Sequence, residues 1–152
     1  SQFDSKGNLR KWWTPADRKR FEKKANIVKR QYDRFVVEGL HVNGKLTLGE
    51  NIADLGGLTI AYEAYQKQLE KTGRRDINGF TPEQRFFLGY AQSEHELSRP
   101  EHLKLAILTD THSPSECRVN GPLSNMPEFY EAFGVKKGDK LYRAPKDRAK
   151  IW

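Results

Sequence analysis

The stretch that decides the fold is residues 50–58, Glu-Asn-Ile-Ala-Asp-Leu-Gly-Gly-Leu, which lie within a long helical pattern. Residues 47–50, Thr-Leu-Gly-Glu, have the capping-box pattern that starts many helices. Apolar residues then recur with helical spacing as far as Leu69, and Gly73 is the kind of residue that ends a helix. The sequence therefore predicts a helix that starts at residue 47 and ends near Gly73.

The same stretch has two features that are unfavourable in a helix. Glu50 and Asp54 lie at i and i+4 on one face, where like charges repel, and Gly56 and Gly57 each cost about 1 kcal/mol relative to alanine. A helix that keeps both features is expected to need its carboxylates close together and another segment packed against the glycines. Paired carboxylates suit a metal ion or acid–base chemistry. The alternative, in which Glu50 merely completes the capping box and Asp54 is solvated, explains the spacing as well.

Upstream of this stretch, the sequence predicts an amphipathic helix that begins at Pro15. Thr14 can cap this helix, and proline suits its first position. Apolar residues then recur at helical spacing on one face, with lysine and arginine on the others: Phe21, Ala25, Val28, Tyr32 and Phe35. Residues 36–46 follow, and the turn signal Asn43-Gly44 predicts a short hairpin or an extended segment there.

Downstream, three further helices are predicted. Residues 81–84, Thr-Pro-Glu-Gln, repeat the capping-box pattern at the start of the first, Pro100–Leu108 form the second, and Pro127–Phe133 form the third. Thr109–Asn125 is predicted to be a loop because it is rich in serine, asparagine, proline and glycine, and residues 135–152 are predicted to be largely irregular. The expected fold is mainly α, with residues 1–152 in a single domain.

The composition is basic and hydrophilic, with 27 lysines and arginines against 20 acidic residues, a formal charge of +7 and a mean hydropathy of −0.84. One interpretation is a basic helical module that binds nucleic acid or another anionic partner. The favoured interpretation of the basic block Lys11–Arg34 is the solvated back of an amphipathic helix. No membrane-spanning segment is expected, because the longest apolar run is Leu105–Leu108, and residues 1–5 lack the features of a signal peptide. Cys117 is the single cysteine, which excludes an internal disulfide and a cysteine-based zinc site.

Residues 50–57 resemble the ENxxDxGG signature of the neprilysin and endothelin-converting-enzyme family of zinc metallopeptidases. Further matches follow the order of the family along nearly the whole chain: Trp12-Trp13, Leu40-His41-Val42-Asn43-Gly44, Arg99-Pro100-Glu101, Asp110-Thr111-His112-Ser113-Pro114 through Arg118, and the chain-ending Trp152. The resemblance implies that the chain is the C-terminal part of a thermolysin-like (gluzincin) catalytic domain. The intact enzyme would then hydrolyse short peptides with the help of one zinc ion.

The resemblance also implies a role for each of four polar residues. Glu50 would be the third zinc ligand, beside two histidines. Asp54 would accept a hydrogen bond from one of those histidines and fix its tautomer. His112 would stabilise the oxyanion of the tetrahedral intermediate, and Arg118 would bind a substrate backbone carbonyl.

One part of the family's site is missing from this sequence. The HExxH helix supplies two zinc ligands and the general base, but the four histidines here include no pair at i, i+4: His41, His95, His102 and His112. By comparison with the family, HExxH is expected in an upstream part of the same polypeptide. The chain alone is therefore expected neither to hold zinc tightly nor to cleave peptides. A zinc-free relative that binds peptides is a further alternative.

Three smaller departures from the family concern individual positions. Animal members have a cysteine where this chain has His95, and a Cys-x-x-Trp ending where it has Ala149-Lys150-Ile151-Trp152. These two changes are typical of a bacterial-type member without those disulfides. Ser93-Glu94 replaces the frequent Val-Trp that helps to wall the pocket for the side chain after the scissile bond. The sequence does not assign the chain to a cellular compartment.

Overall fold

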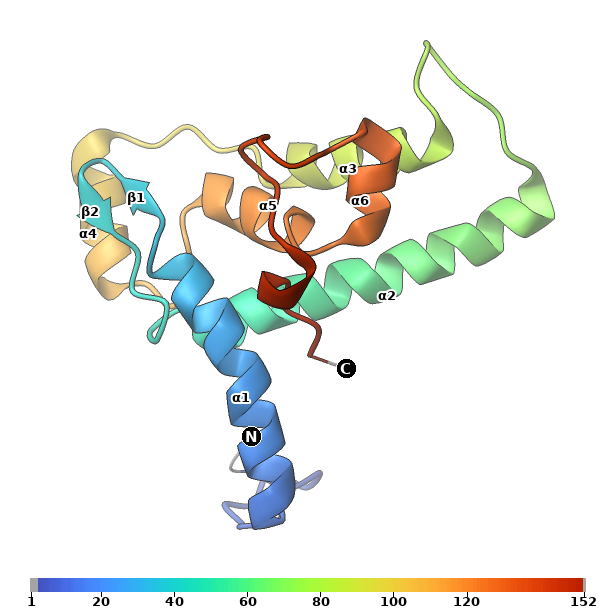
Figure 1. Ribbon diagram of the computed structural model, residues 1–152. Helices are drawn as coiled ribbons and strands as arrows, with labels where there is room; N and C mark the ends of the chain where they lie inside the picture. The colour runs from blue at the N-terminus through green and yellow to red at the C-terminus, as the bar shows by residue number, and fades with distance from the viewer. Residues whose placement is uncertain (1–2, 152) are drawn as a thin grey trace.

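The computed structural model describes residues 3–151, so Ser1, Gln2 and the matched Trp152 lie outside the described residues. The fold is mainly helical, as predicted (Figure 1). Its elements, in chain order, are α1 (Pro15–Tyr32), β1 (Val36–Val37), β2 (Leu40–His41), α2 (Leu48–Thr72), α3 (Pro82–Ser93), α4 (Pro100–Thr109), α5 (Ser115–Leu123), α6 (Pro127–Phe133) and the 3-10 helix Pro145–Asp147. None of the helices within residues 3–151 is long and apolar enough to cross a membrane.

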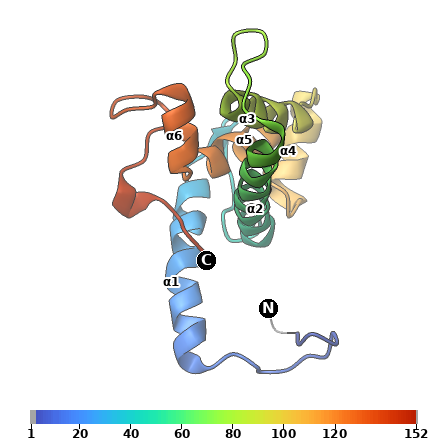
Figure 2. The same ribbon diagram turned by 90° about the vertical axis from the view of Figure 1, so that its right-hand side faces the viewer.

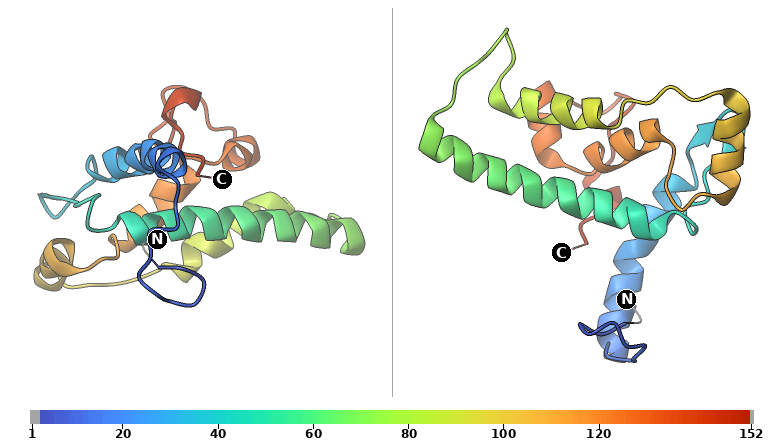
Figure 3. Two further views of the ribbon diagram at one scale, coloured as in Figure 1. Left: turned by 90° about the horizontal axis from the view of Figure 1, so that it is seen from below. Right: turned by 180° about the vertical axis from the view of Figure 1, so that it is seen from behind.

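The long helix α2 organises the molecule. It packs against α5 and against α1, while α3 packs against α6 and α5. Figure 3 shows α2 running along α3 and α5 on one side of the molecule. The N-terminal half of α1 extends away from the other helices, and the segment before it lies at its far end (Figure 2). Helix α2 is therefore held in the body of the fold by α1 and α5.

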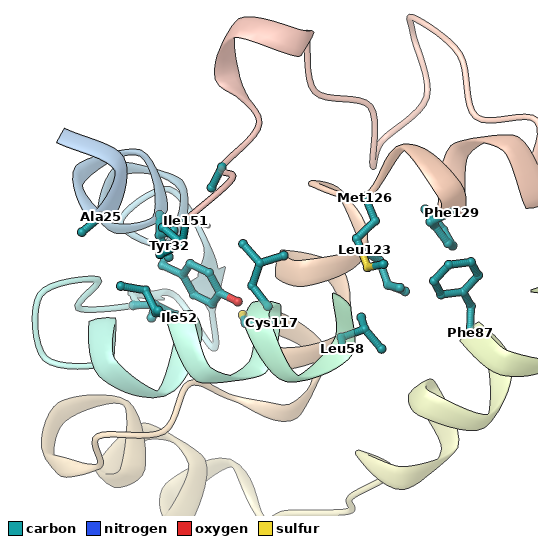
Figure 4. Packing of buried hydrophobic residues seen from close by; sticks show 14 of the residues in the cluster. Ala25, Tyr32, Ile52, Leu58, Phe87, Cys117, Leu123, Met126, Phe129 and Ile151 are labelled. Atoms are coloured by element: carbon teal, nitrogen blue, oxygen red, sulfur yellow. The ribbon is translucent and has the colours of Figure 1, made fainter. Parts of the chain in front are cut away.

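The hydrophobic core runs from α1 through α2 and α5 to α3 and α6. Figure 4 shows Tyr32 and Ile52 near Cys117 at one end of this core, and Phe87 opposite Phe129 at the other. The rings of Phe87 and Phe129 meet edge to face, with centroids 5.5 Å apart, which is a favourable aromatic geometry. The core thus connects α2 with α5, which carries Arg118, and with α3, which contacts Arg118.

The predicted apolar face of α1 is largely confirmed. Ala25, Val28 and Tyr32 are buried, whereas Phe21 is half-buried because it lies toward the extended end of the helix. Phe35 lies beyond the end of the helix at Tyr32 and packs against the core from the following segment.

The predicted hairpin forms, but its turn is not Asn43-Gly44. Strands β1 and β2 pair antiparallel, and the turn between them is Glu38-Gly39, both with positive φ. Gly44 instead allows a close approach to α1, because a Cβ there would lie 2.3 Å from the backbone oxygen of Lys29. Its N–H also donates to Asp33 Oδ1 at 2.9 Å. The glycine is needed for packing rather than for the turn.

The prediction of a loop over Thr109–Asn125 is wrong in its second half, which is helix α5. Two of the residues that suggested a loop are used for packing instead: Gly121 and Pro122 are buried, and a Cβ at Gly121 would lie 2.1 Å from Tyr32 Oη. Tertiary packing therefore outweighs the local turn propensity. The tail is irregular apart from the 3-10 helix, as predicted, and its Ala149 and Ile151 are buried.

The predicted capping box at the start of α2 is also wrong. Thr47 occupies the N-cap position without making a side-chain capping hydrogen bond. Its hydroxyl instead donates to the backbone oxygen of Asn43 and accepts from Asn51 Nδ2, at 3.1 and 2.8 Å. The box at Thr81 does form, with both of its hydrogen bonds to Gln84. Glu50 is therefore not held in a capping box.

Candidate active site

The first two turns of α2 carry both candidate carboxylates, Glu50 and Asp54. Between them, Asn51 is almost fully buried, with 1% of its surface exposed. Its Nδ2 donates to Thr47 Oγ1, and its Oδ1 accepts from Ser113 Oγ, both at 2.8 Å. Asn51 thereby fastens the loop that follows α4 to the start of α2, which brings His112 next to Glu50.

His112 lies between two carboxylates. Its Nε2 is 3.4 Å from Glu50 Oε2, and its Nδ1 is 2.9 Å from Asp110 Oδ1. The backbone N–H of His112 also donates to Asp110 Oδ1 at 2.8 Å, and this hydrogen bond is the main reason why the pKa of Asp110 is lowered. The ionised Asp110 therefore orients the imidazole so that Nε2 faces Glu50.

Arg118, on α5, forms a bidentate ion pair with Asp54. Its Nε donates to Asp54 Oδ2 at 2.9 Å and its Nη2 donates to Asp54 Oδ1 at 2.8 Å. These hydrogen bonds are the largest cause of the raised pKa of Arg118. Bidentate pairs of this kind are among the strongest hydrogen-bonded contacts in proteins and fix the plane of the guanidinium. The pair is largely shielded from solvent, with 26% of the arginine side chain and 12% of the aspartate side chain exposed.

The last turn of α3 supplies two further contacts to Arg118. The hydroxyl of Tyr90 donates to the backbone oxygen of Arg118 at 2.8 Å, and Glu94 Oε2 lies 3.3 Å from Arg118 Nη1. Burial, together with the negative charges of Asp54 and Glu94, raises the pKa of Tyr90, so its hydroxyl keeps its proton and remains a donor. Three helices therefore meet at this arginine.

A hollow of about 480 Å³ opens beside Asp54. It is mainly apolar, and small residues of α2 form one wall: the lining residues are Ala53, Asp54, Gly57, Leu58, Ala61, Phe86 and Tyr90. Gly56 is buried, but a Cβ on Gly57 would meet nothing within 4 Å. The expectation that a neighbouring segment packs against Gly57 is thus wrong within residues 3–151, because the hollow lies there instead.

The geometry brings the four candidate residues into two contacting pairs, Glu50 with His112 and Asp54 with Arg118. Sequence reasoning did not anticipate the Asp54–Arg118 ion pair, nor the parts played by Asn51, Tyr90 and Asp110. Asn51 and Asp110 belong to the matched motifs, but their contacts depend on loops that only the folded chain brings together. No group of three histidine, cysteine, aspartate or glutamate side chains in the described part of the chain has the spacing to hold a metal ion.

This mainly helical fold, with Glu50 beside His112 and Asp54 paired with Arg118, is of the kind found in zinc metalloproteases. The sequence model of peptidase family M13 matches residues 1–149. The chain belongs to this family.

Individual relatives agree with the family match. The chain is 42% identical to endothelin-converting enzyme 1 of Rattus norvegicus and to neprilysin-1 of Caenorhabditis elegans, over 99% of its length in both alignments. Among solved structures, the zinc metalloprotease ZMP1 of Mycobacterium tuberculosis in complex with an inhibitor superimposes with a TM-score of 0.93 and is 40% identical over 99% of the chain. The chain spans about a fifth of the two enzymes, 20% and 21%, and 24% of the ZMP1 chain.

Proposed function

We propose that the protein containing this chain is a zinc metalloendopeptidase that hydrolyses short peptides, and that residues 1–152 are the C-terminal portion of its single catalytic domain. The observation that carries the proposal is the convergence at the start of α2, where Glu50 contacts His112 and Asp54 binds Arg118. A carboxylate, a histidine and an arginine are the groups that amide hydrolysis needs for a metal, an oxyanion and a substrate carbonyl.

Glu50 fits the role of one zinc ligand. Its side chain is 43% exposed, it faces the space beside His112, and no capping box holds it. A carboxylate with two histidines is a common ligand set for catalytic zinc. A bound zinc ion would polarise the scissile carbonyl and lower the pKa of a water molecule. The two histidines are assigned to an upstream HExxH segment of the same polypeptide.

His112 is assigned to the oxyanion. Asp110 Oδ1 lies 2.9 Å from Nδ1, so Nε2 is the ring nitrogen left for the substrate, and an Nε2–H there would donate to a developing negative charge. The loop position gives the ring access to a substrate, since half of the side chain is exposed.

Arg118 is assigned to a substrate backbone carbonyl. A guanidinium has five N–H donors; Asp54 uses one on Nε and one on Nη2, and Glu94 lies beside Nη1. Donors on both Nη atoms therefore remain for a carbonyl oxygen. Asp54 also keeps free acceptor capacity on both oxygens, so it can hold Arg118 and accept from an upstream histidine at the same time.

The proposed upstream segment would lie in the hollow beside Asp54. Ala53, Gly57 and Ala61 lie at i, i+4 and i+8 on one exposed face of α2, where the absence of large side chains lets another helix approach closely. A helix in that place would lie next to both Asp54 and Glu50. This is the contact we propose for the HExxH helix.

The test uses the longest natural polypeptide that contains this chain. We expect about one zinc per molecule and chelator-sensitive cleavage of a fluorogenic peptide. Glu50→Gln should lose both the metal and the activity, whereas the exposed Glu63→Gln on the same helix should lose neither. Peptide binding without zinc would favour the zinc-free alternative, and unchanged zinc content in Glu50→Gln would refute the ligand assignment.

A further inference from the structure

Arg118 is shared by two carboxylates that come from different helices. Asp54 of α2 already gives the guanidinium a complete bidentate partner. Glu94, at the C-cap of α3, lies 3.3 Å from the remaining nitrogen, Nη1. Within residues 3–151, Arg118 is the one cation within ion-pair distance of Glu94. One positive charge thus faces two negative charges in a region where the three side chains are only 12–26% exposed.

Glu94 lies in an electrostatically unfavourable position, and nothing in the fold of α3 itself requires a carboxylate there. The C-terminal end of a helix carries partial negative charge, so a carboxylate at the C-cap is repelled by the helix. Asp54, on the opposite side of the guanidinium, adds a second repulsion. Because Asp54 alone satisfies the geometry of Arg118, the second carboxylate leaves an excess negative charge beside it.

Glu94 is also held in place before any substrate arrives. One turn earlier on α3, the hydroxyl of Tyr90 donates to the backbone oxygen of Arg118 at 2.8 Å. The C-terminal end of α3 therefore contacts both the backbone and the side chain of Arg118. A charge fixed in this way needs no reorganisation to meet a ligand, which increases its effect on specificity.

On the basis of the function proposed above, we propose that Glu94 selects a lysine or arginine side chain on the substrate residue whose backbone carbonyl Arg118 binds. The β-carbon of that side chain is separated from the carbonyl carbon by two bonds. The side chain therefore lies within reach of the guanidinium that binds the carbonyl and of the Glu94 carboxylate beside it. A cationic side chain balances the excess negative charge. An apolar side chain would leave this charge desolvated and uncompensated, and an acidic one would be repelled.

The first test is a cleavage-site profile of the longest natural polypeptide that contains this chain, on a peptide library randomised at the positions next to the cleaved bond. We expect lysine and arginine to be enriched, and glutamate and aspartate depleted, at one position. Two peptides that differ only by arginine or leucine at that position then give a ratio of kcat/KM. We expect a ratio of about 10 or more in favour of arginine, the usual size of one charge contact in a shielded site.

Glu94→Gln, which removes the charge with little change of shape, should lower this ratio about tenfold. Glu94→Asp keeps the charge and should keep a preference for arginine. The matched control is Glu96→Gln: Glu96 is an exposed carboxylate two residues away that accepts hydrogen bonds from Ser98 and Ser115, outside the Arg118 cluster. Its ratio should equal that of the wild type.

The outcomes separate this inference from the proposed function. A library profile without basic enrichment, or a ratio that does not change in a folded Glu94→Gln protein, overturns the role of Glu94 and leaves peptidase activity standing. Absence of cleavage by the zinc-loaded wild-type protein overturns both. The wild-type order of arginine, leucine and glutamate peptides decides the question even if both Glu94 variants fail to fold.

Discussion

At the scale of single residues, the site depends on side chains that orient other side chains. Asp110 holds the ring of His112, Asp54 holds the guanidinium of Arg118, and Asn51 holds the loop that carries His112. Each of these contacts is made by a group that is ionised or buried, where a hydrogen bond restricts motion most strongly. The two groups proposed to meet the substrate are therefore oriented before it binds.

The first prediction concerns His112. In the intact protein, His112→Ala should lower kcat by about 100- to 1,000-fold, because it removes a donor to the charge that develops in the transition state. KM should change less, since a carbonyl in the ground state carries little of that charge. The measurement is steady-state hydrolysis of one fluorogenic peptide. The control is His102→Ala, an exposed histidine of α4; an unchanged kcat in the His112 variant would contradict the assignment.

The sequence alone could name candidate site residues, but not the contacts between them. The matched segments supplied the four candidate side chains, Glu50, Asp54, His112 and Arg118, and the roles assigned to them stay predictions. The sequence did not predict that Arg118 binds Asp54, since the two residues are 64 positions apart and nothing local relates them. The same holds for Asn51 and Ser113, which are 62 positions apart. Such contacts follow from tertiary packing, which a single sequence does not display.

At the scale of elements, local signals predicted helix starts well and failed where packing decides. Thr14 and Thr81 cap their helices as expected. Each directly precedes a proline at the start of the helix, and its hydroxyl accepts from a backbone N–H of the first turn. Helix α5 was missed, since its serine, asparagine, glycine and proline suggest a loop. Gly121 explains the difference: it lets α5 lie directly over the Tyr32 ring, and the burial that results stabilises the helix.

The second prediction tests this contact between α1 and α5. Gly121→Ala should destabilise the protein by about 1–3 kcal/mol, because the new methyl group would lie 2.1 Å from Tyr32 Oη and 2.5 Å from Cζ in a packed core. The matched control is Gly89→Ala in the middle of α3, where a Cβ meets nothing within 4 Å and should stabilise the helix by about 0.5–1 kcal/mol. Thermal unfolding of the intact proteins measures both. Equal melting temperatures for the two variants would contradict the packing argument.

At the scale of the whole molecule, the net charge of +7 does not by itself define a nucleic-acid surface. Acidic partners interrupt the basic face of α1, where Arg18 pairs with Glu22, Arg20 with Asp17, and Lys29 with Asp33. Its opposite face enters the core through Ala25, Val28 and Tyr32. The positive charges of α1 are therefore partly neutralised on the solvated face of an amphipathic helix.

The third prediction follows from this distribution. The chain should bind DNA or RNA only weakly, without sequence preference, and binding should disappear as salt rises toward physiological concentration, because nonspecific phosphate contacts are lost by counterion competition. Fluorescence anisotropy with a labelled duplex and a labelled single strand at two salt concentrations measures it. Tight binding at physiological salt would favour the basic binding module over the peptidase assignment.

The whole molecule also exposes several large apolar side chains. The hollow beside Asp54 is open, and Ile60 on the same helix is 62% exposed. Leu9 and Trp12, before α1, are 71% and 49% exposed. Apolar groups exposed together on one molecule mark surfaces that normally contact another segment. The segment proposed to lie in the hollow beside Asp54 would cover part of this apolar surface on α2.

The last prediction concerns zinc and the isolated chain. A catalytic zinc site needs three protein ligands, and here Glu50 faces one histidine, His112, whose other nitrogen is already held by Asp110. One carboxylate with a histidine so engaged competes poorly with water for the ion, and the general base of HExxH is not in this sequence. The chain alone should therefore carry well below one zinc per molecule after gel filtration and should not cleave a fluorogenic peptide. The intact protein, treated identically, is the control. Stoichiometric zinc with chelator-sensitive cleavage in the isolated chain would show that its residues form a different metal site.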